Sequence, residues 1–214
     1  MPRGAQKNTF GLMYSFRKRT AIVALPLLLG MVGTVAVFAQ SVTDRFVLDD
    51  FTSENGESAI GSRWEAFTDR VMGGRSDMQA GYIRLGGDTV LRMMGDVSLE
   101  NNGGFVQVRL PLLSNGFQNA DAWEGFFLTV RGRPGSYYMH LRDDRTVFPW
   151  SYYKAAVDVD ESWQTVLVPF SGFEPESMPR GSSPNLQGLR SVALVAAGGN
   201  FRAQVDMREI GLYR

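Results

Sequence analysis

The feature that most constrains this chain is the alternation of apolar and polar residues, which recurs from residue 44 to the C-terminus. In 106–110 the apolar residues alternate with Gln and Arg, and in 137–142 the odd-numbered residues are apolar. In 126–131 two interleaved sets of side chains alternate in the same way. A period of two places successive side chains on opposite faces of a strand, as half-buried antiparallel strands require. Since no window of ten or more residues in this region carries a helical stripe, the pattern predicts an all-β fold.

Short segments of this kind recur at regular spacing, and turn-forming residues such as those at 101–104 and 133–135 separate them. The predicted strands are 46–51, 82–85, 90–94, 106–110, 126–131, 137–142, 152–158, 163–168, 191–196 and 203–213. Many short strands indicate a β-sandwich or barrel. The longest stretch without a strand pattern, 174–187, is predicted to be a surface loop within one domain that spans 40–214.

The last predicted strand changes parity partway along its length. Its apolar residues occupy odd positions as far as Met207 and even positions from Ile210 onward. One long strand can bury both sets only if an extra residue resets the alternation. We therefore expect a β-bulge near 208–209.

Charge is divided unevenly along the chain. Lys+Arg (22) and Asp+Glu (22) balance overall, but residues 1–39 hold five basic residues and no acidic one. Residues 40–214 therefore hold 17 basic and 22 acidic residues, a net charge of −5. Phosphate binding needs a basic field, so this composition argues against a nucleic-acid-binding role. The absence of cysteine from the sequence excludes disulfides, thiolate metal sites and a cysteine nucleophile.

The N-terminal segment has the pattern of a secretory signal peptide. A basic stretch ending at Arg19 precedes an uncharged run, and small residues lie before a polar stretch. We predict a signal peptide over 1–39 with cleavage between Ala39 and Gln40, although Met13 is an alternative start. The alternative is an uncleaved membrane anchor, because the apolar run approaches the roughly 20 residues that span a bilayer. In both cases the body is expected to be exported, in the periplasm or secreted.

The first segment that could carry function is 69–77, Asp-Arg-Val-Met-Gly-Gly-Arg-Ser-Asp. A phosphate-binding loop would need a following helix and a Gly-Lys-Ser/Thr ending, which this segment lacks. It is interpreted either as a tight turn whose arginines pair with Asp69 or Asp77, or as a loop that contacts a ligand or partner. The candidate contacts are Asp69, Arg70, Met72 and Arg75, and the structural turn glycines are Gly73 and Gly74.

The second segment is 95–105, which contains Asn-Asn-Gly-Gly at 101–104. Asn and Gly tolerate a positive φ, so the simplest interpretation is a turn between two strands, with Gly103 and Gly104 as structural glycines. The side-chain amides of Asn101 and Asn102 are also candidates to bind sugar hydroxyls.

The third segment is the aromatic run 148–153, in which Trp150, Tyr152 and Tyr153 are candidate binding residues. Aromatic rings either pack a sandwich core or form platforms on which sugar rings stack. Only one of Tyr152 and Tyr153 can point into the core. The other tryptophans, Trp64, Trp123 and Trp163, are predicted to be core residues.

The acidic residues and the single histidine do not form a recognisable catalytic set. The acid pairs at 49–50, 143–144 and 158/160 match no calcium loop and are predicted to be solvated strand edges. His140 falls on the polar face of its strand, and the chain has no nucleophile-elbow motif. We therefore predict no catalytic residues, no metal site and no cofactor.

Taken together, Trp64, 69–76 and 95–105 in this order resemble the complex I intermediate-associated protein 30 family. The segments 152–153 and 162–170 fit the same pattern, so the resemblance covers about 46–213. The family usually has Asp-Gly-Val-Met-Gly-Gly, and Arg70 replaces the first glycine here. The resemblance implies a jelly-roll sandwich similar to galactose-binding-like modules. Mitochondrial members are assembly chaperones for respiratory complex I, and the family offers no agreed catalytic set.

Two hypotheses of function follow. The first is a non-catalytic, exported binding module of bacterial type that binds a protein client in an assembly or chaperone-like role. The alternative is a carbohydrate-binding or weakly carbohydrate-active domain that uses the Asn amides and the aromatic run. Neither hypothesis involves nucleic acid, and a membrane is involved only if the leader is uncleaved.

Overall fold

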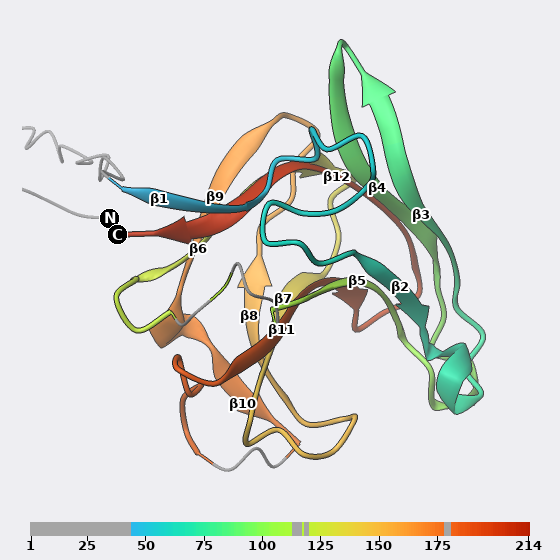
Figure 1. Ribbon diagram of the computed structural model, residues 1–214. Helices are drawn as coiled ribbons and strands as arrows, with labels where there is room; N and C mark the ends of the chain where they lie inside the picture. The colour runs from blue at the N-terminus through green and yellow to red at the C-terminus, as the bar shows by residue number, and fades with distance from the viewer. Residues whose placement is uncertain (1–43, 113–116, 118–119, 178–180) are drawn as a thin grey trace, which may run out of the picture. The chain divides into compact units, whose positions relative to one another are not determined.

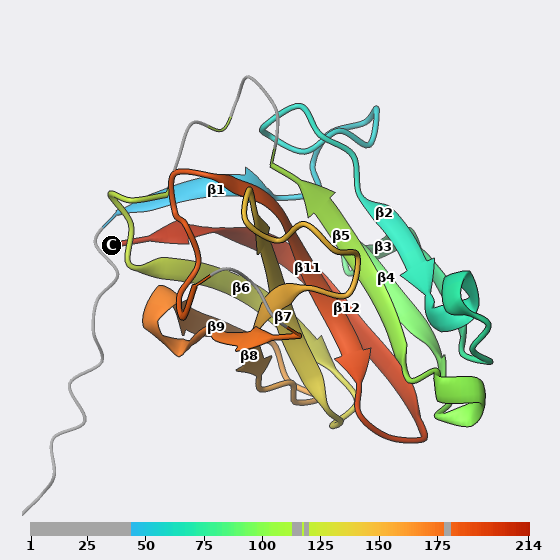
Figure 2. The same ribbon diagram turned by 90° about the horizontal axis from the view of Figure 1, so that it is seen from below.

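The computed structural model describes residues 44–112, 117, 120–177 and 181–214. The predicted signal peptide and its cleavage site lie outside the described residues. The described chain forms two six-stranded antiparallel sheets (Figures 1 and 2). The first sheet has the order β3-β4-β12-β6-β9, with β1 also pairing with β12, and the second has the order β10-β8-β7-β11-β5-β2. The predicted all-β sandwich is confirmed.

The strands of the first sheet are β1 (Arg45–Asp49), β3 (Asp77–Leu85), β4 (Asp88–Val97), β6 (Gly125–Gly132), β9 (Gln164–Pro169) and β12 (Phe201–Tyr213). Those of the second sheet are β2 (Glu65–Thr68), β5 (Phe105–Pro111), β7 (Tyr137–Asp143), β8 (Tyr152–Val157), β10 (Glu174–Glu176) and β11 (Leu189–Ala197). Short 3-10 helices lie in the connections: η1 (Asp69–Met72), η2 (Glu100–Asn102) and η3 (Phe170–Gly172). None of the helices among the described residues has the length and apolar character needed to cross a bilayer.

The inward faces of the two sheets form one hydrophobic core. On β7, Tyr137, Met139 and Leu141 are buried, whereas Tyr138 and His140 are only partly buried on the opposite face. This is the alternation that the sequence predicts. The largest fully buried side chains come from both sheets: Tyr137, Tyr153, Phe126, Phe127, Leu48, Met93, Leu110, Leu112, Leu128, Met139, Leu141 and Leu194.

The long strand β12 contains the predicted bulge. Its register with β6 shifts between Met207 and Glu209, which leaves Arg208 as the extra residue. The predicted loop 174–187 is wrong at its start, because Glu174–Glu176 form β10 and pair with β8. The other strand missed by the sequence, β2, is a four-residue edge strand that pairs with β5.

The tryptophans occupy two kinds of environment. Trp64 and Trp123 pack against the core, as predicted. The prediction that Trp163 is a core residue is wrong. Because the even-numbered residues of β9 face the core, Trp163 lies on the outer face of the first sheet. There the guanidinium carbons of Arg131 and Arg208 each lie 4.9 Å from its ring centroid.

Candidate functional site

The carboxylate of Asp69 connects the two Gly-rich segments of the sequence. Asp69 opens η1 directly after β2, and its side chain is fully buried. It accepts hydrogen bonds from the backbone amides of Ser76 (2.9 Å) and Gly104 (2.6 Å), and also from the Ser76 hydroxyl. The amide of Phe105 adds a longer contact of 3.4 Å. Segments that are 35 residues apart in the chain are therefore held on one side chain.

The charge state of Asp69 follows from these partners. Burial acts to raise the pKa of the carboxyl group, but the hydrogen bonds from Ser76 and Gly104 outweigh it and hold the pKa below its ordinary value. The group is thus ionised at neutral pH. Among the described residues, no ion pair reaches it, so hydrogen-bond donors alone compensate its charge.

Glycines surround this carboxylate for two separate reasons. Gly73 ends η1 with φ of 89°, and Gly104 has φ of 133°, so both adopt the left-handed region that favours glycine. Gly74 and Gly103 lack a positive φ, but a Cβ at either position would overlap the Asp69 carboxylate. All of the glycines predicted to be structural therefore have a physical reason for their identity.

The other candidate contacts in these segments lie outside the buried centre. Arg70 forms the predicted ion pair with Asp77 (3.6 Å), and Arg75 is exposed. Asn101 donates through Nδ2 to the carbonyl of Gly73 at 3.4 Å, so it links the two turns. Asn102 is exposed. Asp69 is too deeply buried to contact a ligand, and it does not pair with either arginine.

The two turns expose apolar side chains at one end of the sandwich, where Figure 2 shows η1 and η2 side by side. Val71 is 71% exposed, Met72 is 59% exposed, and Leu99, which precedes η2, is 49% exposed. We call these three residues the turn surface. The sequence identified Met72 but missed Val71 and Leu99. The available signal was an apolar residue inside a Gly-rich turn, where no strand alternation buries it.

A second buried carboxylate, Asp143, holds the connection between β7 and β8. It accepts from the backbone amides of Arg145 (3.0 Å), Thr146 (3.1 Å) and Asn185 (2.7 Å), and the Arg145 guanidinium also binds it. The prediction that the acid pairs are solvated edges is therefore wrong at Asp143. It is also wrong at Asp49, which is buried and accepts a hydrogen bond from the Trp64 indole. Backbone amides compensate both carboxylates, and the sequence does not show such partners.

The aromatic run is divided among three environments. Trp150 is 56% exposed, and its ring stacks on that of Phe148 at 5.2 Å with an interplanar angle of 8°. Tyr152 lies on the outer face of the second sheet and stacks on His140 at 3.9 Å. Tyr153 is fully buried, so only one of the two tyrosines points into the core, as predicted. This burial removes Tyr153 from the candidate binding residues.

The outer face of the second sheet carries polar and aromatic side chains on β8, β7 and β5. In one row of paired residues, Lys154, His140, Ala193 and Arg109 follow one another across four strands. Burial, together with the positive charge of the neighbouring Lys154, lowers the pKa of His140 to about 3. The imidazole is therefore neutral at physiological pH and presents an uncharged ring to Tyr152.

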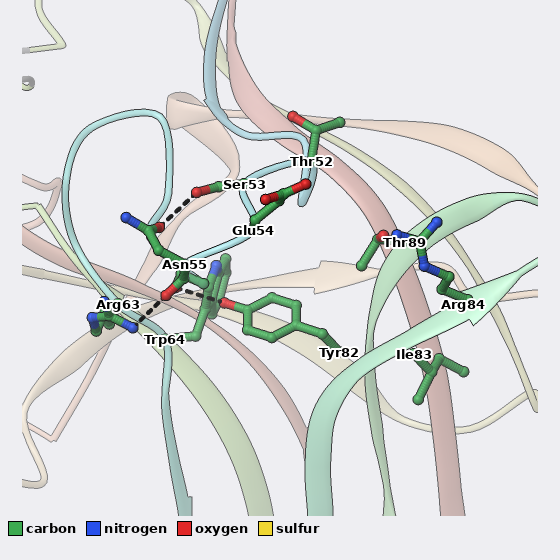
Figure 3. Close-up of a pocket in the computed structure, with 11 residues that line it drawn as sticks. Thr52, Ser53, Glu54, Asn55, Arg63, Trp64, Tyr82, Ile83, Arg84 and Thr89 are labelled. Carbon is green, nitrogen blue, oxygen red and sulfur yellow. Dashed lines mark hydrogen bonds between the residues drawn. The ribbon is translucent and has the colours of Figure 1, made fainter.

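A hollow of about 680 Å³ lies on another part of the molecule, between the loop that follows β1 and the β3–β4 hairpin (Figure 3). Residues that line the hollow are hydrogen-bonded to one another. The Tyr82 hydroxyl donates to the carbonyl of Gly56 (3.3 Å), and Arg63 donates to the carbonyl of Asn55 (2.7 Å). Its lining residues are Thr52, Ser53, Glu54, Asn55, Gly56, Arg63, Trp64, Tyr82, Ile83, Arg84 and Thr89. The sequence singled out none of these as ligand-binding.

The titratable side chains are dispersed. Within the described part of the chain, no group of three or more His, Asp or Glu residues lies close enough to hold a metal ion. His140 contacts Tyr152 and is paired in register with Lys154. The features described above are exposed side chains, on the turn surface and at the Phe148–Trp150 stack, above loops that the buried carboxylates of Asp69 and Asp143 hold in place.

Comparison with known proteins identifies a family and a fold. The model of the family described as complex I intermediate-associated protein 30 (CIA30) matches residues 50–205. No curated protein sequence matches the chain.

Several solved structures are similar. One is the family 11 carbohydrate-binding module of the cellulosomal cellulase Lic26A-Cel5E of Clostridium thermocellum, with a TM-score of 0.62 and 14% identity, covering 80% of this chain and 95% of that one. Another is a family 11 module from the same organism in complex with a β-1,3-1,4-mixed-linked tetrasaccharide (TM-score 0.60, 13% identity, 78% and 94% coverage). An agarase, AgWH50C, also matches, with a TM-score of 0.52 and 12% identity, over 79% of this chain and 24% of that protein. At these identities the likeness shows the β-sandwich fold.

Proposed function

Since the chain belongs to the complex I intermediate-associated protein 30 family, we propose that it is a non-catalytic binding module that engages a protein client. The name of the family associates it with an intermediate of complex I. The observation that carries the proposal is the turn surface, where Val71, Met72 and Leu99 are exposed next to a fully buried framework.

The turn surface has the physical character of a docking site. When a partner covers exposed apolar side chains, the free energy of binding becomes more favourable by about 25 cal/mol for each Å² of apolar surface removed from water. Asp69 fixes the backbone beneath them, so a partner would meet a preformed surface and lose little conformational entropy on binding. The exposed Arg75 adds a cation near its edge. Methionine and arginine, the residue types of Met72 and Arg75, are both enriched at protein interfaces.

The test is affinity capture after crosslinking, with the tagged protein and with a Val71→Ser/Met72→Ser variant. We expect the unmodified protein to recover one defined partner in near-equal amount and the variant to lose it. The matched control is Val147→Ser, because Val147 is equally apolar and 60% exposed on a different loop. Recovery of the same partner by the variant, or of background alone by the unmodified protein, would contradict the proposal.

A second candidate function is carbohydrate binding, which the stacked rings of Phe148 and Trp150 favour. Flat, exposed aromatic faces are suited to stacking against sugar rings. The structural similarity to carbohydrate-binding modules supports the same proposal. A glycan array tests it: we expect binding that Trp150→Ala abolishes. An array without binding, or binding unchanged by Trp150→Ala, would remove this candidate.

We further propose that the body acts outside the cytoplasmic membrane, as the basic leader predicts. A client in an envelope complex would then be reachable. Mass spectrometry of the mature N-terminus, combined with cell fractionation, tests this directly. We expect a chain that begins at Gln40 in the exported fraction. A cytoplasmic chain that begins at Met1 or Met13 would overturn it.

A further inference from the structure

The outer face of the second sheet gathers positive charge although residues 40–214 are acidic overall. Arg109 on β5, Arg142 on β7 and Arg190 on β11 come from three adjacent strands. Between the long side chains, β11 contributes the short Ser191 and Ala193, which pair in register with both neighbouring strands. The basic groups are therefore not separated by bulky residues of the central strand.

Part of this charge lacks a carboxylate partner. Arg109 binds Glu65, with Nε 3.0 Å from Oε2. Arg142, in contrast, donates to the backbone carbonyls of Thr146 (3.1 Å) and Phe148 (2.9 Å). In the part of the chain that the structure describes, no ion pair joins Arg142 or Arg190 to an acid. Guanidinium groups held close together without counter-charge are suited to receive an anion.

The positive charges of these arginines act on one another. Burial lowers the pKa of Arg142, and the charges of Arg109 and Arg190 lower it further. An anionic ligand would relieve this repulsion, because it supplies a counter-charge to Arg142 and Arg190. The basic side of the face is thus better matched to a carboxylate than to a neutral hydroxyl group.

A loop that carries aromatic rings is hydrogen-bonded to one of these cations. The hydrogen bond from Arg142 to the Phe148 carbonyl connects the sheet face to the loop that carries the Phe148–Trp150 stack. On the same face, Tyr152 stacks on the neutral ring of His140. A ligand that satisfies the whole surface needs flat apolar ring faces together with acidic groups.

We propose that this face binds an acidic saccharide chain, with sugar rings on the Phe148–Trp150 stack and ring carboxylates on Arg142 and Arg190. This inference rests on the carbohydrate binding proposed above and assigns its ligand class. A uronic acid polymer combines a ring face and a carboxylate in every residue. Nucleic acid is the weaker match, because the net charge of −5 on residues 40–214 opposes a long polyphosphate.

The experiment uses isothermal titration with an oligogalacturonate of about six residues and with its fully methyl-esterified form. The ester keeps the sugar rings and removes the charge, so the pair isolates the contribution of the carboxylates. We expect the acid to bind at least about tenfold more tightly than the ester at low salt, because a charge-assisted hydrogen bond is roughly twice as strong as a neutral one. Added salt should reduce this difference.

Two variants and one control locate the site. Arg142→Gln and Arg190→Gln should each weaken binding of the acid by about 5- to 10-fold and leave binding of the ester unchanged. Arg190→Gln is the safer variant, because Arg190 is exposed, whereas Arg142 also bonds the loop. Thermal unfolding confirms that each variant is folded. Arg84→Gln, which changes an exposed arginine on β3 of the other sheet, should alter neither affinity.

The possible outcomes distinguish failure of this inference from failure of the carbohydrate-binding proposal on which it rests. Equal affinity for the acid and the ester would overturn the acidic ligand class and leave carbohydrate binding intact. The same holds if the array shows only neutral glycans. If no glycan binds at all, both fail. The inference would also be overturned if inorganic polyphosphate bound as tightly as oligogalacturonate and Trp150→Ala changed neither affinity. That result would show a general anion site.

Discussion

Asp69 and Asp143 invite comparison, because each is a fully buried carboxylate that orders a loop with exposed apolar side chains. Asp69 lies beneath Val71 and Met72, and Asp143 lies beneath the loop that carries Trp150. Their partners differ. Asp69 meets only amides and a hydroxyl, whereas Asp143 also binds the guanidinium of a partly exposed arginine.

The difference shows how strongly each loop depends on its carboxylate. Asp69 joins segments 35 residues apart, so its loss would leave buried donors on two turns. Asp143 also joins distant segments, because it binds residues two and three positions away together with Asn185, which lies 42 positions away. Its arginine, however, is partly exposed and can still reach water. In both cases the framework is internal, so the exposed side chains above it are available for binding. The following predictions test this comparison.

The largest effect is expected for Asp69→Asn. The new amide would place an N–H group against the donors of Ser76 or Gly104 in a buried site. We expect a loss of about 2–4 kcal/mol in the free energy of unfolding, measured by urea denaturation. Asp77→Asn is the control, because Asp77 is exposed and its ion pair with Arg70 lies at the surface, and it should cost less than about 0.5 kcal/mol. A loss below about 1 kcal/mol at Asp69 would refute its role.

Asp143→Asn should cost less, about 1–3 kcal/mol by the same measurement. The guanidinium of Arg145 can turn toward solvent when its partner loses charge, so fewer buried groups are left unpaired. Asp144→Asn, at the exposed neighbouring position, is the matched control. If Asp143→Asn proved more damaging than Asp69→Asn, the ranking of the two carboxylates would be reversed.

Substitution of the positive-φ glycines should give a cost of about 1–3 kcal/mol. Gly73→Val meets only backbone strain, because open space surrounds its Cβ position, whereas Gly104→Val also crowds Leu99. Gly104→Val should therefore be the more destabilising of the two in thermal melts. Gly73→Asn should be milder, because Asn tolerates left-handed backbone. Unchanged melting of both valine variants would contradict this account.

His140 makes the second sheet sensitive to acid. Its pKa is lowered from 6.5 to about 3, so between these pH values the unfolded chain binds a proton that the folded protein excludes. Stability should fall as pH decreases through this window and level off below it. We expect the unmodified protein to lose about 1–2 kcal/mol more than His140→Gln between pH 7 and pH 4, a range in which one pKa unit corresponds to about 1.4 kcal/mol. If the free energy of unfolding of the two proteins changed in parallel with pH, this effect would be excluded.

The smallest effects on stability are expected at the exposed side chains. Met72→Ser and Trp150→Ala should each change the free energy of unfolding by less than about 0.5 kcal/mol, because neither side chain belongs to the core. Their effects should appear in binding instead. A destabilisation above about 1 kcal/mol at either position would show that the loop depends on its exposed side chain and would weaken the proposed separation of framework and surface.

The sequence predicted the fold where one face of a strand is buried and the other is not. On β7 the alternation is regular, and the parity change in β12 located the bulge at Arg208. The two strands that were not predicted, β2 and β10, are the edges of the second sheet. In β2 the burial hardly alternates, and β10 contains a proline that only an edge strand accommodates.

The candidate site was predicted only in part, because its framework depends on contacts that residue types do not reveal. The glycines marked the turns correctly, since a positive φ has a compositional signal. No signal in the residue types indicates that Asp69 is buried, because its partners are backbone amides that any residue supplies. Arg142 and Arg190 lie 48 positions apart, and only the strand order brings their charges together.

The pairing of β1 with β12 has a practical consequence. Asp44 and Arg214 exchange backbone hydrogen bonds and form an ion pair, so the two ends of the described body lie side by side, at the opposite end of the sandwich from η1 (Figure 1). A short peptide could join them, and the chain could be reopened within an exposed loop to give a circular permutant. Such a rearranged protein would keep every strand pair while changing which strands are made first.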